Sequence, residues 1–179
     1  MNNDDLLKKL KQIRKVCFRE VSRRSVEQWA REERYLGPDS TALPGKWTPV
    51  FQGSIEPLQA ITKQGVRKIT IMSSAQLMKS DIILNALGYF LTEDPTSVIL
   101  AQPSEAQAEE FSKTRVDTLI RDTKVLNEQI KDKRDRDSGN HTFLKQVQNG
   151  AKLMIVSAAA PSDLASRSAR VLLLDELDR

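Results

Sequence analysis

Four residues in two distant parts of the sequence are of the types that bind and cleave phosphate groups. Lys79 and Ser80 begin an apolar stretch of helical character, and Asp175 and Glu176 directly follow an apolar run. A lysine and a hydroxyl at a helix N-terminus can hold phosphate oxygens and a metal ion. Two carboxylates at the end of a buried strand can hold that metal and take a proton from water. The residue types therefore indicate phosphate chemistry assisted by a divalent metal.

The segment that ends at Ser80 follows the order of a phosphate-binding P-loop, in which a strand leads through a loop into a helix. It reads SSAQLMKS from Ser73, whereas the P-loop pattern is G-x-x-x-x-G-K-S/T. Lys79 and Ser80 match the pattern, and Ser73 and Met78 replace its two glycines. The residues predicted to bind ATP are Ser74, Ala75, Gln76, Leu77, Met78, Lys79 and Ser80, with the Ser80 hydroxyl also on Mg²⁺. A Lys-Ser pair before an apolar helix is otherwise compatible with an ordinary helix start.

The second motif is the acidic pair after the apolar run Val171 to Leu174. Asp175 is predicted to hold Mg²⁺ through water, and Glu176 to orient and deprotonate the water that attacks the γ-phosphate. The alternative is a polar turn that merely follows a core strand. Because Lys79 lies 96 residues upstream of Asp175, an ordinary separation for these two motifs, their combination favours a nucleotide site.

Apolar runs along the chain predict the elements that position these residues. The runs are Ile69 to Met72, Val98 to Ala101, Leu153 to Val156 and Val171 to Leu174. Such runs suit strands buried on both faces of a parallel sheet, and helical segments at 81–91 and 104–121 lie between them. The sequence therefore predicts an α/β fold, namely a P-loop NTPase of the ASCE type, with helices on both faces of a mostly parallel central sheet.

The first part of the chain is predicted to be helical and carries the excess of positive charge. Residues 1–35 contain ten Lys and Arg against six Asp and Glu. An amphipathic helix is expected over 4–22, and Ser25 with Gln28 forms a capping box for a second helix that ends at Gly37-Pro38. We expect an N-terminal helical segment over 1–36, a linker over 37–57 and a P-loop ATPase core over 58–179. A mixed-charge loop or helix end is expected over 128–137.

Composition excludes several other classes of protein. The chain has one cysteine, Cys17, and one histidine, His141, so it can form neither an internal disulfide nor a Cys/His metal site. No stretch approaches the roughly 18 to 20 apolar residues of a membrane span, and the N-terminus lacks the core of a signal peptide. We therefore expect an intracellular protein without a membrane partner.

Taken together, the motifs resemble the large terminase subunits of tailed phages, particularly the lambda-like branch. The similarity covers most of the chain, and its pieces are Trp29 to Leu36, Pro44 to Trp47, Phe51-Gln52, Ser74 to Gln76 before Lys79, Asn85 to Tyr89, Gln102 to Ser104, Leu164 to Arg167 and Leu172 to Arg179. The resemblance implies a motor that uses ATP and Mg²⁺ to move double-stranded DNA into a procapsid. It also implies a nuclease domain elsewhere in the protein, a ring of identical subunits, a small terminase subunit and a portal as partners, and a location in the host cell cytoplasm.

The resemblance assigns two further residues. Gln52 falls near the glutamine that reads adenine in this family, and Arg167 is the candidate for an arginine that senses the γ-phosphate. Because the chain stops soon after Glu176, we expect it to be part of a longer protein and to hydrolyse ATP weakly by itself. Two alternatives stay open: a helicase-like ATPase, suggested by Gln102 to Ser104 and opposed by Leu164 to Arg167, and a DNA-binding or assembly module that has lost its nucleotide.

Overall fold

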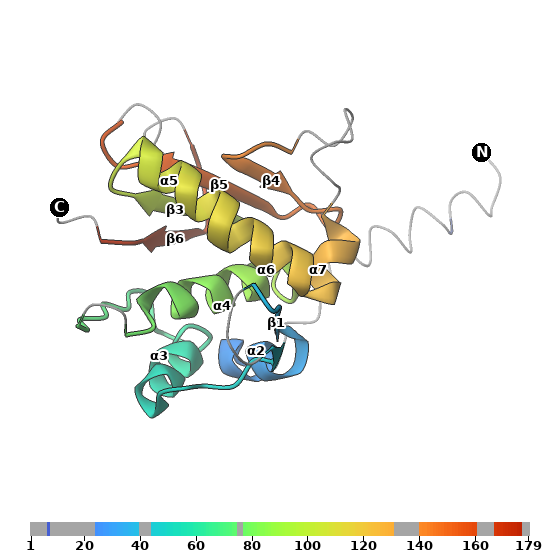
Figure 1. Ribbon diagram of the computed structural model, residues 1–179, viewed down its shortest axis with the longest axis vertical. Helices are drawn as coiled ribbons and strands as arrows, with labels where there is room; N and C mark the ends of the chain where they lie inside the picture. The colour runs from blue at the N-terminus through green and yellow to red at the C-terminus, as the bar shows by residue number, and fades with distance from the viewer. Residues whose placement is uncertain are drawn as a thin grey trace.

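The computed structural model describes Leu7 and residues 24–39, 44–74, 77–130, 140–160 and 167–176. Three helices run across a four-stranded sheet: α5 (Glu105–Phe111), α6 (Asp117–Asp122) and α7 (Lys124–Gln129) (Figure 1). Helix α4 (Lys79–Thr92) lies between the sheet and two further helices, α2 (Val26–Glu33) and α3 (Ile55–Ala60). None of the helices in these ranges is both long enough and apolar enough to cross a membrane.

The sheet is mostly parallel, as the apolar runs predicted. Its order is β4 (Leu144–Gln146), β5 (Lys152–Ser157), β3 (Ser97–Gln102), β6 (Val171–Leu174), and β3 pairs in parallel with both β5 and β6. Only β4 runs antiparallel to its neighbour. The α/β layered class is therefore confirmed, with one antiparallel edge strand that the sequence did not indicate.

One of the four expected strands is absent. Residues 66–74, which include the run Ile69 to Met72, follow no strand or helix pattern and are exposed. An apolar run becomes a strand only where a neighbouring strand pairs with its backbone. In the described part of the chain β6 has a partner on one side only, and Leu172 and Leu174 are 55% and 53% exposed there. The prediction of a strand before the phosphate loop was therefore wrong for this structure.

The opposite edge of the sheet has a different character. Lys145 of β4 is 1% exposed, and its ammonium lies 3.1 Å from the Asp117 carboxylate. The same ammonium donates a hydrogen bond to the His141 carbonyl oxygen at 2.9 Å. The edge strand β4 thus carries a buried charge, whereas the edge strand β6 carries exposed leucines.

The helix that contains Trp29 begins as predicted and ends earlier. Ser25 and Gln28 form the predicted capping box of α2. The helix stops at Glu33, because Arg34 adopts an extended conformation and its carbonyl accepts the Trp47 backbone N–H at 3.0 Å. Tyr35–Leu36 (β1) then pairs antiparallel with Gly45–Lys46 (β2), so this stretch is a two-stranded ribbon and not a helix end.

Helix α2 belongs to the main hydrophobic core. Trp29 is fully buried, and a Cβ atom added to Gly88 of α4 would lie 1.9 Å from its indole ring. Gly88 therefore lets the two helices approach closely. The core also includes Trp47, which follows β2, and Leu58 of α3. The short turn η1 (Gln52–Ser54) directly precedes α3. The expected helix over 4–22 lies outside the described residues, apart from Leu7, as does most of the expected loop over 128–137.

Candidate nucleotide-binding site

Lys79 and Glu176 lie together although 97 residues separate them in the sequence. The Lys79 ammonium nitrogen is 2.5 Å from Glu176 Oε1. Lys79 is the first residue of α4, and Glu176 stands two residues beyond the end of β6. Because the carboxyl ends of parallel strands are where ligands bind in open α/β sheets, this pair occupies the expected edge.

A cavity of about 550 Å³ opens beside this ion pair. It is lined by the start of α4, by β1 and the residues that flank it, by the middle of the long helix that follows β3, and by Glu176. Of the residues predicted to bind nucleotide, Leu77, Met78, Lys79 and Ser80 line this cavity. Ser74 is exposed and outside the lining, and Ala75 and Gln76 lie outside the described residues.

The loop before α4 reaches the helix through an unusual backbone conformation. Met78, the N-cap residue, has φ 54° and ψ 6°, which is the left-handed region that glycine occupies most readily. The P-loop pattern has glycine at this position. Upstream, the Leu77 N–H donates to the Ser74 carbonyl oxygen at 3.4 Å, so the loop closes on itself before the helix begins. The backbone thus keeps a conformation suited to glycine, although the residue is methionine.

Asp175 is placed by the sheet. Its backbone N–H donates to the Ala101 carbonyl at 3.1 Å, and its carboxylate accepts a hydrogen bond from the Gln102 amide at 3.1 Å. The Asp175 side chain is buried, whereas Glu176, with φ 48°, turns toward Lys79. The two neighbouring carboxylates therefore have different partners, Gln102 for Asp175 and Lys79 for Glu176.

Of the two residues predicted to hold Mg²⁺, Ser80 lines the cavity and Asp175 does not. Carboxylate and hydroxyl oxygens, as on Asp175 and Ser80, are ligands that Mg²⁺ prefers. Within the described ranges no group of three His, Cys, Asp or Glu side chains stands close enough to hold a metal. These residues fit Mg²⁺ only as partial ligands, since most of its coordination in nucleotide sites comes from phosphates and water.

The buried Arg34 contacts the first turn of α4, a contact that the sequence analysis did not predict. Arg34 is 5% exposed, lies 2.6 Å from the Asp81 carboxylate, and donates to Asn85 Oδ1 at 2.5 Å. Burial lowers the pKa of the Arg34 guanidinium from its ordinary value, and the Asp81 carboxylate raises it in part. The indole N–H of Trp47 donates to the other Asp81 oxygen at 2.9 Å. Arg34 and Trp47 thus fix the first turn of α4 through Asp81.

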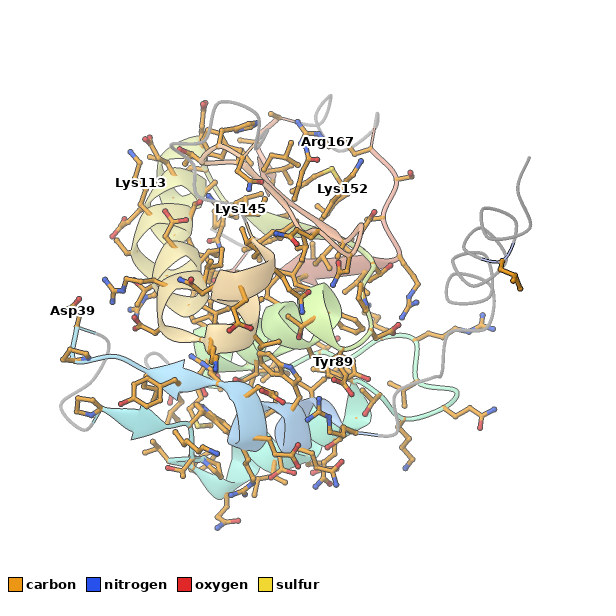
Figure 2. The ribbon with its side chains drawn as sticks, turned by 90° about the vertical axis from the view of Figure 1, so that its right-hand side faces the viewer. Asp39, Tyr89, Lys113, Lys145, Lys152 and Arg167 are labelled. Atoms are coloured by element: carbon orange, nitrogen blue, oxygen red, sulfur yellow. The ribbon has the colours of Figure 1, made fainter. Side chains whose placement is uncertain are left out.

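The two residues assigned only by resemblance do not line the cavity. Gln52 lies exposed in η1. Arg167 is exposed and lies far from Asp39, which does line the cavity (Figure 2). The adenine contact of Gln52 and the phosphate contact of Arg167 stay predictions.

A mostly parallel sheet, a lysine at the start of a helix and two acidic residues after a strand form an arrangement typical of P-loop ATPases. The sequence profile of the family described as phage terminase large subunit gpA, ATPase domain, matches residues 41–179. The chain belongs to this family of ATPase domains from phage terminase large subunits.

Two curated relatives are terminase large subunits. That of Enterobacteria phage P21 is 28% identical over 151 residues, which cover 84% of this chain and 23% of the relative. That of Escherichia phage lambda is 29% identical over 163 residues, which cover 89% of this chain and 25% of the relative. The chain thus spans about a quarter of the length of these relatives. No solved structure matches.

Proposed function

We propose that the cavity beside Lys79 binds ATP with Mg²⁺, and that its hydrolysis drives double-stranded DNA into a procapsid. The observation that carries the proposal is the ion pair between Lys79 and Glu176, because it joins the two motifs at one edge of the sheet. A lysine that holds phosphate and a carboxylate that activates water must both reach one γ-phosphate, and the ion pair puts both side chains within such reach.

Each residue has a role that follows from its position. The Lys79 ammonium binds the β- and γ-phosphates, and the backbone amides at the start of α4 face them. Asp175 and the Ser80 hydroxyl hold Mg²⁺, which neutralises phosphate charge when it is bound. Glu176 leaves Lys79 when the nucleotide enters, and its carboxylate then accepts a proton from the attacking water.

The wider setting is proposed from family membership. The ATPase would act in a ring of identical subunits at the portal of a procapsid, in the host cell cytoplasm, with a small terminase subunit as partner. Nuclease activity belongs, on this proposal, to another part of the full-length protein. The basic segment upstream of Arg24 is the proposed contact for the small subunit, because residues 1–35 carry ten basic and six acidic residues.

Equilibrium binding of labelled ATP to the 179-residue chain, with and without Mg²⁺, tests the proposal. Lys79→Ala should weaken binding by at least about tenfold, since a charge-assisted contact to phosphate is worth roughly 1.5 to 3 kcal/mol. Lys124→Ala is the matched control, because Lys124 is exposed on α7 and pairs with Glu128 at 3.8 Å, away from the cavity. Equal affinity of the parent and Lys79→Ala would remove the phosphate role from this loop and favour a module without nucleotide.

A further inference from the structure

The long helix after β3 changes its hydrogen-bonding pattern where it borders the cavity. Between α5 and α6, residues Ser112–Val116 form a π-helical turn, η2. Such turns are rare and are frequently found at functional sites. Ser112 and Val116 of η2 are buried, whereas Thr114 and Arg115 line the cavity together with Lys79. The turn therefore brings a basic side chain to the cavity wall from a second element.

Arg115 differs from the other basic residues that line the cavity, because among the described residues its guanidinium has no acidic partner. Arg34 is paired with Asp81, and Lys79 is paired with Glu176. Within the part of the chain that the structure describes, Arg115 forms no ion pair and no side-chain hydrogen bond, although it carries five N–H donors. An exposed guanidinium of this kind can bind an incoming anion without first breaking another contact.

The charge of the cavity makes this residue important for an anionic ligand. Three basic side chains line it, against four acidic ones: Arg34, Lys79 and Arg115 against Asp39, Asp81, Asp122 and Glu176. Asp39 and Asp122 both pair with Arg121, which lies outside the lining. Two of the three cations are already neutralised, so Arg115 supplies the uncompensated positive charge.

We propose that Arg115 is a phosphate-binding residue of this site, reaching the triphosphate tail from η2 while Lys79 and Ser80 reach it from α4. The inference rests on the proposed ATP site. A guanidinium can bind two phosphate oxygens at once, which a lysine ammonium cannot do in the same geometry. Arg115 thus favours ligands with a long phosphate chain over a nucleoside monophosphate.

Titrations of the 179-residue chain with MgATP, MgADP and AMP test this role. Arg115→Ala should weaken MgATP binding by about tenfold or more and AMP binding by much less. Arg115→Lys should recover part of the loss, because it restores the charge without the planar fork. Lys113→Ala is the matched control. Lys113 lies in the same turn and pairs with Glu109, outside the cavity, so its variant should bind all three ligands as the parent does.

Other binding results would contradict either the role of Arg115 or the ATP site itself. If Lys79→Ala weakens MgATP binding and Arg115→Ala does not, the ATP site stands and the role of Arg115 is wrong. Equal losses of MgATP and AMP in Arg115→Ala would show that the side chain supports the shape of the cavity and does not bind phosphate. If neither variant changes affinity, the ATP site itself is wrong, and the inference fails with it.

Discussion

Lys79 of α4 and Glu176 after β6 hold each other in an ion pair of 2.5 Å, so without nucleotide the two proposed active groups neutralise one another. The contact is only partly buried, with 27% of the Lys79 side chain and 31% of the Glu176 side chain exposed. A pair of this kind is worth about 0.2 to 1 kcal/mol. A triphosphate must compete with the Glu176 carboxylate for the Lys79 ammonium, and it can displace that carboxylate because it carries several negative charges.

Glu176→Gln should therefore raise the affinity for ATP while it abolishes hydrolysis. Removal of the competing carboxylate frees Lys79, and we expect up to about fivefold tighter binding, the equivalent of the upper end of the pair's energy. The amide cannot accept a proton from water, so turnover should be lost. Fluorescence titration and phosphate release in the full-length protein measure the two effects. Glu128→Gln on α7 is the control, and equal or weaker binding by Glu176→Gln would contradict the competition.

The left-handed backbone conformation of Met78 should make the free energy of unfolding depend on whether a glycine or an alanine replaces it. Glycine is ordinarily favoured over alanine at a helix N-cap, and φ 54° adds a backbone cost for any residue that has a Cβ atom. We expect Met78→Gly to exceed Met78→Ala in unfolding free energy by about 1 kcal/mol, since a residue with a Cβ costs roughly 1 to 2 kcal/mol in this region. Urea denaturation of the two variants measures the difference. An alanine variant as stable as the glycine variant would mean that this turn relaxes when the methionine side chain is removed.

Substitution of Asp81 should lower the free energy of unfolding strongly, because Asp81 is the charge partner of the buried Arg34 guanidinium. Asp81→Asn keeps an oxygen for the Trp47 indole but leaves the guanidinium without its charge partner. Removing one member of a buried pair costs about 3 kcal/mol or more. Asp94→Asn is the control. Asp94 pairs with the half-exposed Arg170 on the surface, and its loss should cost less than about 1 kcal/mol. Equal midpoints for both variants in urea would show that Arg34 finds another partner.

Deletion of residues 1–23 should leave the ATPase core folded and remove binding of the small terminase subunit. It spares Arg24, whose guanidinium lies 2.6 Å from Glu32 and also pairs with Glu93. Deletion of residues 1–36 is the contrasting variant, because it removes Trp29 from the core and should unfold the domain. Thermal melts followed by circular dichroism, and sedimentation with the small subunit, measure both effects. A 1–23 deletion that still binds the small subunit would place the contact elsewhere.

The main layers and the meeting of the two motifs could be predicted because they depend on local pattern and on one rule of topology. Apolar runs of four residues predicted β3, β5 and β6, and parallel strands bring their carboxyl ends to one edge of the sheet. Glu176 follows β6, whereas the strand expected before Lys79 is absent, so the proximity of these two residues was predicted from their motifs and not from strand topology alone.

The rest of the cavity could not be predicted in the same way. Arg34 was assigned to a helix, because nothing in the sequence shows that its backbone becomes extended to pair with the Trp47 segment. Arg115 stands in a regular amphipathic pattern, and the π-turn that directs it to the cavity leaves no signature in residue types. The run Ile69 to Met72 has the composition of a strand, but a strand also requires a partner, which composition does not supply.

The contrast between the two edges of the sheet bears on how the protein behaves at high concentration. A buried charge on an edge strand opposes pairing with another molecule, because any added strand would have to accommodate it. Lys145 protects the β4 edge in this way. The β6 edge has no such charge, and its exposed Leu172 and Leu174 offer an apolar template for intermolecular strand pairing. We expect self-association of the 179-residue chain to begin at β6, and a lysine in place of Leu172 to keep it dispersed in solution.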